Sequence, residues 1–217
     1  MTKQQAGAKL QINIQQANIK EERTFVLLKP DAVQRGLVGE IVDRFERRGL
    51  KIIGLKMIHA SREQIDAHYP TSDAWLTRVG EKTLSTYEKY NMDAKAELGT
   101  NDPKKIGVMV RGWLVDFMTS GPMVKIVVQG IHAIDMVRKL AGNTIPAFAE
   151  MGTIRGDYSV DSAASANRDH RAIYNLIHAS ETIEEATHEL DYWMSPEDIF
   201  TYKRSDDEVA FPSKRSE

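Results

Sequence analysis

The 217-residue chain contains no cysteine, which excludes a disulfide framework, a thiol nucleophile and thiolate metal sites. It has no long apolar run, and stretches such as residues 25–28 are far too short to span a bilayer. Neither sign of charge dominates, because 29 Lys and Arg residues stand against 31 Asp and Glu residues. That balance argues against a dedicated nucleic-acid binder. The first 20 residues are rich in Gln and Asn and lack the apolar segment of a secretory signal. We therefore expect a cytoplasmic protein with no membrane partner.

The apolar pattern predicts four strands that alternate with helices, which is an α/β (α+β) arrangement. Apolar runs indicate strands at 24–28, 50–58, 123–128 and 176–177, and helical spacing indicates helices at 38–48, 61–69, 131–141 and 183–194. We expect a four-stranded sheet with helices on one face. Residues 70–117 have helical periodicity and are interpreted as an insertion, 152–157 as a tight polar loop, and 195–198 as the start of a short helix. Polar segments at 1–21 and 205–217 are interpreted as an N-terminal arm and a charged C-terminal tail.

Three side chains do not fit the pattern around them. Arg138 lies within the predicted inward arc of its helix, and Glu189 borders an apolar stripe beside Trp193. His178 stands between a strand and a capped helix, where open α/β proteins place functional groups. Ion pairing and a structural histidine are the ordinary explanations for such residues. None of the six histidines has a metal-binding spacing, so no zinc site is predicted.

Two features indicate phosphate chemistry. Residues 152–157 (GTIRGD) place Arg155 in a glycine-flanked loop, and Lys29 ends a strand. The sequence has neither a P-loop (GxxxxGK[ST]) nor a GxGxxG motif, which disfavours a P-loop kinase and a Rossmann enzyme.

Several segments, taken in order, resemble the nucleoside diphosphate kinase family. The most specific is 175–181 (NLIHASE), which is similar to the family's active-site signature Asn-x-x-His-Gly-Ser-Asp/Glu. The others are 22–25 (ERTF), 29–31 (KPD), 35–41 (RGLVGEI), 68–69 (HY), 120–122 (SGP), Arg138 with 142–144 (GNT), and 152–157. The resemblance covers most of residues 22–204, apart from a helical insertion at about 70–117 and a loop insertion at about 161–172.

The resemblance implies a ferredoxin-like sandwich, a four-stranded antiparallel sheet covered by helices. It implies an enzyme that moves the γ-phosphoryl of ATP to other nucleoside diphosphates and so maintains NTP and dNTP pools. The mechanism would be ping-pong through a phosphohistidine, with Mg²⁺ on the nucleotide phosphates and no protein side chain as metal ligand. It implies a homo-oligomer, a tetramer or a hexamer. The alternative is a family member with a mainly regulatory or binding role and weak nucleotide exchange.

The resemblance also implies individual roles. His178 would be the nucleophile, Glu189 would hydrogen-bond its other ring nitrogen, and Ser180 would support that carboxylate. Tyr69 would line the phosphate pocket, and Asn175 would bind the ribose. The phosphates would be held by Lys29, Arg138, Thr144 and Arg155, and the candidates for base contact are Trp75 and Leu114.

The sequence departs from the family pattern next to the histidine. Ala179 stands where the family normally has glycine, which is tolerable only if the backbone there is not at positive φ. The two insertions alter the segments that usually contact the base and neighbouring subunits. A degenerate member would lack His178, Glu189 or an arginine, and none is missing, which favours an active enzyme.

Overall fold

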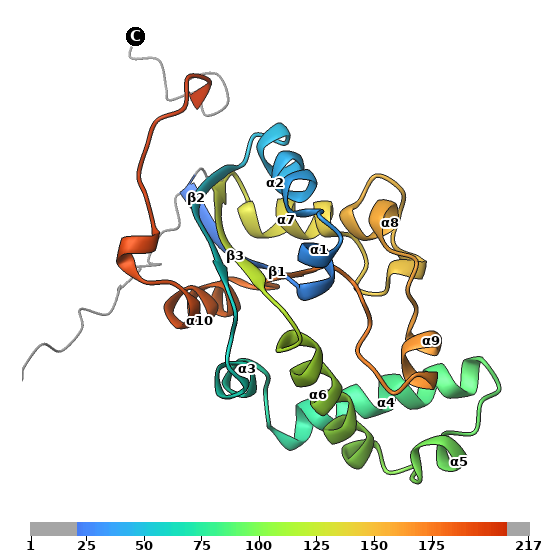
Figure 1. Ribbon diagram of the computed structural model, residues 1–217. Coiled ribbons are helices and arrows are strands. Elements are labelled where there is room, and N and C mark those ends of the chain that lie inside the picture. Colours follow the sequence, from blue (N-terminus) through green and yellow to red (C-terminus); the bar gives the residue numbers. More distant parts are fainter. Residues whose placement is uncertain (1–20, 208–217) are drawn as a thin grey trace, which may run out of the picture.

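The computed structural model describes residues 21–207, which are built around one four-stranded antiparallel sheet (Figure 1). Its strands are β1 (Glu22–Leu28), β2 (Lys51–Ile58), β3 (Met123–Gly130) and β4 (Ile177–Ala179), in the order β2-β3-β1-β4. The antiparallel sheet and its helices form the expected ferredoxin-like α/β fold. In β4, His178 lies opposite Leu27 of β1, which places it at the centre of the short edge strand. The predicted arm (1–21) and the end of the predicted tail lie outside the described residues, apart from Glu21 and 205–207.

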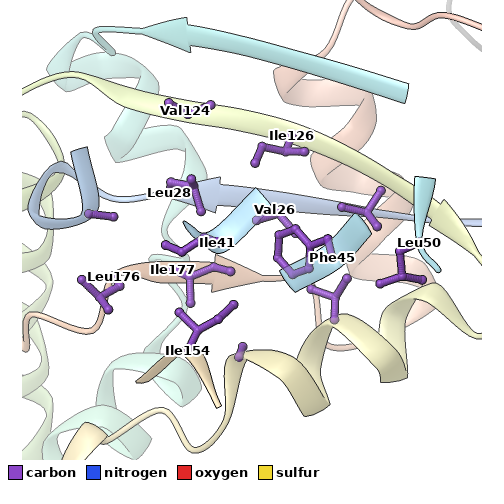
Figure 2. Close-up of a cluster of buried hydrophobic side chains, with 14 residues drawn as sticks. Val26, Leu28, Ile41, Phe45, Leu50, Val124, Ile126, Ile154, Leu176 and Ile177 are labelled. Atoms are coloured by element: carbon purple, nitrogen blue, oxygen red, sulfur yellow. The ribbon is translucent and has the colours of Figure 1, made fainter. Parts of the chain in front are cut away.

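Helices cover both faces of the sheet, so the expectation of one covered face is wrong. Successive strand residues point to opposite faces. Val26 and Leu28 therefore enter one core cluster (Figure 2), whereas Phe25 and Leu27 enter another. All four are fully buried, which leaves this part of β1 without a polar face. The first cluster is closed by α1 (Pro30–Gln34), α2 (Val38–Arg47), α7 (Ala133–Ala141) and α8 (Ile154–Tyr158), and the second by α3 (Arg62–His68), α6 (Pro103–Met118) and α10 (Ile183–Trp193).

The segment predicted as a helical insertion contains α4 (Asp73–Lys89), α5 (Ala94–Leu98) and most of α6. Two glycines let α4 approach the start of α6 closely. A Cβ on Gly80 would lie 1.8 Å from the Pro103 carbonyl oxygen, and a Cβ on Gly107 would lie 2.0 Å from that of Leu76. A third apolar cluster, which includes the buried ring of Tyr87, fills the space between these helices.

The segment predicted as a loop insertion, 161–172, contains a short helix, α9 (Ala163–Arg168). Ser162 caps it by accepting a hydrogen bond from the Ser165 amide. It lies against the helical insertion (Figure 1), where the Tyr87 hydroxyl donates to the Asn167 carbonyl oxygen at 3.4 Å. Two segments that are far apart in the sequence therefore pack as one unit.

Several predicted boundaries need correction. The tight loop predicted at 152–157 is largely α8, because Thr153 caps it by accepting from the Gly156 amide. Helix α1 and the 3-10 helix η2 (Pro146–Phe148) were not predicted, although each has proline in its first turn. The short helix predicted after Ser195 is the 3-10 helix η3 (Pro196–Asp198). Within residues 21–207, no helix is both long enough and apolar enough to cross a membrane.

Candidate active site

A cavity of about 710 Å³ opens beside β4 and is lined by residues from β4, α3, α7 and α10. It brings together most of the side chains that the sequence singled out. The predicted residues that line it are Lys29, Tyr69, Trp75, Arg138, Thr144, Arg155, Asn175, His178 and Glu189. Leu114 is not among the residues that line this cavity, because its side chain packs against the second core cluster. The fold thus places a histidine, a carboxylate and three cationic side chains around one space.

His178 contacts a buried carboxylate through one ring nitrogen. Its Nε2 lies 2.6 Å from Oε1 of Glu189, and the Ser180 hydroxyl donates to Oε2 at 2.6 Å. Burial alone would raise the pKa of Glu189, but the hydrogen bonds from His178 and Ser180 outweigh it and hold that pKa below its usual range. An ionised carboxylate only accepts hydrogen bonds, so Nε2 carries the proton and Nδ1 keeps its lone pair. Neutral imidazole with a free Nδ1 is the nucleophilic form.

A second histidine borders the same carboxylate. Nδ1 of His68 lies 3.8 Å from Oε1 of Glu189, and it accepts a hydrogen bond from the Trp193 indole at 3.3 Å. Burial, together with neighbouring His178, lowers the pKa of His68 to about 4. The His68 ring is therefore neutral near pH 7 and does not compete with His178 for the negative charge of Glu189. His68, His178 and Glu189 are close enough to hold a metal ion, although both Glu189 oxygens already accept hydrogen bonds.

Lys29 follows β1 and reaches the cavity as a buried cation. Its Nζ donates to Oδ1 of Asn175 at 2.7 Å, and Nδ2 of Asn175 donates to the Thr144 carbonyl oxygen at 2.8 Å. Burial, and next the charge of Arg155, lower the pKa of Lys29 to about 8, while Asp31 opposes the shift. Both ends of the Asn175 amide are thus engaged by the protein itself.

Arg155 is 8% exposed and braces the backbone around β4. Its guanidinium donates to the carbonyl oxygens of Asn175, Gly142 and Ile177 at 3.1, 2.7 and 2.6 Å. A guanidinium has five N–H groups, so two remain for a ligand. Gly142 is required for this approach, because its φ is +78° and a Cβ would lie 2.4 Å from Oγ1 of Thr153. Burial, and next the charge of Arg138, lower the pKa of Arg155 to about 10.

Arg138 does not point into the core, contrary to the sequence prediction. Helix α7 begins at Ala133 rather than Ile131, and Arg138 lies beside its inward arc with its side chain 43% exposed. It pairs with Glu181 at 2.9 Å at the edge of the cavity. The ordinary explanation, an ion pair, therefore holds for this structure, and the cation still faces the cavity.

Two aromatic rings also line the cavity. Tyr69 and Trp75 lie with ring centroids 6.4 Å apart and planes inclined by 38°. Burial, and next the charge of Glu189, raise the pKa of Tyr69, so its hydroxyl stays protonated. Trp75 lies in the first turn of α4, so the segment predicted as a helical insertion supplies part of the cavity wall.

The residue after the histidine has ordinary strand geometry. Ala179 belongs to β4 and pairs with Val26 of β1. Its methyl group therefore meets no conformational penalty there, which answers the question raised by the missing glycine.

Sequence reasoning missed two residues of this region. Asp31 is 7% exposed and accepts a hydrogen bond from the Leu176 amide at 3.0 Å. Leu176 has a φ of +67°, which no local sequence signal indicates for a leucine. The segment KPD held the only signal for Asp31, a carboxylate two residues after a strand-end lysine.

The site has a nucleophilic histidine whose tautomer is fixed by a carboxylate, and cationic side chains surround it. Such a site on a ferredoxin-like sheet fits a phosphotransferase. The family model "Nucleoside diphosphate kinase" matches residues 22–75 and 110–199. A nucleoside diphosphate kinase of Pyrobaculum aerophilum is 48% identical over 82% of this chain and 97% of its own length, and one of Pyrococcus furiosus is 39% identical over 86% and 91%. This chain belongs to the nucleoside diphosphate kinase family and is an enzyme of that class.

Solved structures agree. A crystal structure of an NDP kinase from Pyrobaculum aerophilum superposes with a TM-score of 0.81 at 46% identity, covering 83% of this chain and all (100%) of that one. A transition-state mimic of the nucleoside-diphosphate kinase from Borrelia burgdorferi, with bound vanadate and ADP, has a TM-score of 0.72 at 32% identity, covering 89% and 99%.

Proposed function

We propose that this enzyme moves the γ-phosphoryl of ATP to other nucleoside diphosphates through His178, and so maintains NTP and dNTP pools. The observation that carries the proposal is the contact of His178 Nε2 with buried Glu189 at 2.6 Å, inside a cavity lined by Lys29, Arg138 and Arg155. This arrangement leaves Nδ1 free to attack phosphorus. A regulatory member with a degenerate site would have no need of it.

In the first half-reaction, Nδ1 of His178 attacks the γ-phosphorus of ATP. The N–P bond forms as the bond from the γ-phosphorus to the β,γ-bridging oxygen breaks, and ADP leaves with that electron pair. Glu189 stabilises the positive charge that develops on the ring, because Nε2 keeps its proton. In the second half-reaction, a terminal oxygen of another nucleoside diphosphate attacks the phosphorus. The N–P bond breaks as the O–P bond forms, its electron pair returns to Nδ1, and the ring becomes neutral again.

The cationic side chains stabilise the phosphoryl group while it is being transferred. Negative charge spreads over its equatorial oxygens, so fixed positive groups lower the barrier. Lys29, Arg138 and the two remaining N–H groups of Arg155 are placed for this role, with Thr144 at the same edge. Tyr69 lines the phosphate end of the cavity. Removing one such cation is expected to cost on the order of 3–4 kcal/mol, by analogy with lost oxyanion donors.

Nucleotide binding divides between two parts of the cavity. We assign Asn175 to the ribose, where its amide would share its existing bonds with Lys29 and Thr144. Trp75 is the candidate for the base, because it is an aromatic ring on the cavity wall that could stack on a base. Leu114 lies away from the cavity and is not proposed for this role.

Mg²⁺ fits this site as part of the substrate. Three cations line the cavity, and both oxygens of Glu189 are used by His178 and Ser180. The side chains therefore suit nucleotide phosphates that carry their own Mg²⁺. Bound there with the nucleotide, the ion would neutralise part of the phosphate charge.

We also propose a homo-oligomer, a tetramer or a hexamer. β2 is an edge strand of the sheet, and Leu55 and Met57 on it are 49% and 58% exposed. An exposed apolar edge strand is a ready surface for pairing with another copy. Light scattering coupled to gel filtration would give the mass directly, and a monomer would contradict the proposal. A cytoplasmic location stays a prediction from composition.

The central test is phosphoenzyme formation. Purified protein is mixed with γ-labelled ATP and Mg²⁺ without acceptor, and then GDP or UDP is added. We expect an acid-labile, alkali-stable label that discharges into the triphosphate. His178→Ala should abolish the label, whereas His59→Ala, on an exposed histidine outside the cavity, should keep it. Label that survives His178→Ala would refute the assignment, and no label on the unaltered enzyme would favour the binding role.

A further inference from the structure

The backbone two residues before His178 has an unusual conformation. Leu176 has a φ of +67°, and the amide of Ile177 donates to the Asn175 carbonyl oxygen at 2.7 Å. A bond between residues i and i+2 at positive φ closes a γ-turn, which is rare and strained. The Leu176 side chain is fully buried in the first core cluster (Figure 2). A residue with a Cβ adopts this conformation only where its surroundings impose it.

The surroundings of the turn are well defined. The Leu176 amide donates to Oδ2 of Asp31 at 3.0 Å, and its carbonyl oxygen accepts from the Lys29 amide at 2.8 Å. Arg155 binds the carbonyl oxygens of Asn175 and Ile177. The Lys29 amide and Arg155 bind only carbonyl oxygens of the turn, and Asp31 alone among these partners accepts from an amide of it. The Asp31 carboxylate is thus the group that holds the Leu176 amide.

The position of Asp31 is energetically unfavourable for a carboxylate. It is 7% exposed, and its Oδ1 is buried with no hydrogen-bond partner among the residues described. Burial raises its pKa, although Lys29 and the backbone amides partly oppose that shift. A carboxylate in such a place is a poor choice for stability alone.

We propose that Asp31 is a positioning residue for phosphoryl transfer, because its hydrogen bond to the Leu176 amide holds the strained turn that sets Asn175 and His178 in the cavity. The inference rests on the function proposed above. Without this bond, Leu176 can relax toward negative φ. That rotation would separate the two carbonyl groups that Arg155 binds and change the direction in which the chain enters β4.

A different role for Asp31 would be electrostatic, since its charge raises the pKa of Lys29. Two substitutions separate the roles. Asp31→Asn keeps an oxygen that can accept from Leu176 but removes the charge. Asp31→Leu removes the acceptor and keeps the branched shape of the side chain.

The first experiment compares the rates of single-turnover phosphoenzyme formation at pH 7. An unsatisfied buried amide predicts that Asp31→Leu is slower by roughly tenfold to a hundredfold, mainly in the rate constant at saturating ATP. Asp31→Asn should stay within about fivefold of the unaltered enzyme. Equal losses in both variants would overturn the positioning role. If the unaltered enzyme takes no label, the proposed function fails, and the next readout still tests the turn.

The second experiment monitors the Leu176 amide by ¹H–¹⁵N NMR and by hydrogen exchange. Asp31→Asn should keep its hydrogen-bonded shift and its protection, and Asp31→Leu should lose both. An unchanged Leu176 amide in Asp31→Leu would overturn the proposal, whatever the activity.

A matched pair at the turn tests the strain directly. Glycine adopts positive φ without penalty, whereas alanine keeps the Cβ, and both remove the same buried side chain. In the Asp31→Leu background, Leu176→Gly should therefore form phosphoenzyme at least about threefold faster than Leu176→Ala. Equal rates would contradict the proposal. Thermal unfolding of each variant identifies any that fails to fold. In that case the same comparison is made in the Asp31→Asn background, where the retained acceptor should bring the two rates close together, and a clearly faster Leu176→Gly would contradict the proposal.

Discussion

Phosphoenzyme formation should fall at alkaline pH because of Lys29. Burial and Arg155 lower the pKa of this lysine to about 8 in the free enzyme. A base with a lowered pKa loses its charge at a lower pH, so the cation disappears as pH rises through about 8. The phosphates of ATP are the groups that need this charge. The value of kcat/KM reports the free enzyme and should show the loss.

The size of the effect follows from the titration. With a pKa of about 8, about nine-tenths of Lys29 molecules are charged at pH 7 and about one-tenth at pH 9. We therefore expect kcat/KM for phosphoenzyme formation to fall about tenfold between these values. An unperturbed lysine, with a pKa of about 10.4, would lose less than a tenth of its charge over the same range.

The assay is rapid quenching of γ-labelled ATP with enzyme at constant ionic strength from pH 6.5 to 9.5. Lys29→Met is the control, because it has no charge to lose. It should be slower by roughly two to three decades, with no fall centred near pH 8. A flat profile for the unaltered enzyme up to pH 9.5, or the same fall in Lys29→Met, would refute this account.

Three further variants test other parts of the cavity. Glu189→Gln replaces a charged acceptor with a neutral one, so the rate of phosphoenzyme formation should fall at least about tenfold. The ¹⁵N NMR spectrum of His178 should then show a mixture of ring tautomers, and an unchanged spectrum would contradict this. Glu181→Gln frees Arg138 from an exposed ion pair, so KM for ATP in steady-state assays should fall, by less than about fivefold; a rise would count against phosphate binding by Arg138. Trp75→Ala should raise KM by roughly fivefold to a hundredfold if the ring stacks on the base, and Tyr90→Ala, an exposed ring away from the cavity, is the comparison.

Much of the fold was predictable because it follows from short-range patterns. The strands that carry the sheet are nearly continuous apolar runs, and the capping residues Ser61 and Thr182 mark the starts of two helices. The covering of both faces is also contained in those runs, since a strand such as β1 has no polar face to expose. The one-faced expectation overlooked this point. Helices α8 and α9 were missed because they are single turns in polar segments, fixed by the caps of Thr153 and Ser162.

Without the family resemblance, the site was predictable from the two signals for phosphate chemistry, at Lys29 and Arg155, and from side chains that conflict with their own element. Glu189 and Arg138 were recognised in this way, although Arg138 conflicts only if its helix is started two residues too early. Leu176 could not be recognised, because leucine at positive φ is imposed by partners 145 positions away, such as Asp31. Leu114 shows a different limit. A match to a motif does not fix which way a helix turns its side chain, and Leu114 is not among the residues that line the cavity.

The two segments predicted as insertions pack together as one unit. Trp113 of the first stacks on His170 of the second, with ring centroids 5.7 Å apart and planes 5° apart. Either insertion alone would leave an apolar surface without its partner, as at the buried ring of Tyr87 under α9. The first segment also brings Trp75 to the cavity, and the second ends shortly before Asn175. The parts of the cavity proposed for the base and the ribose are therefore joined to this unit. Because Asn175 also begins the turn that leads to His178, the same unit is joined to the nucleophile as well as to the wall of the cavity.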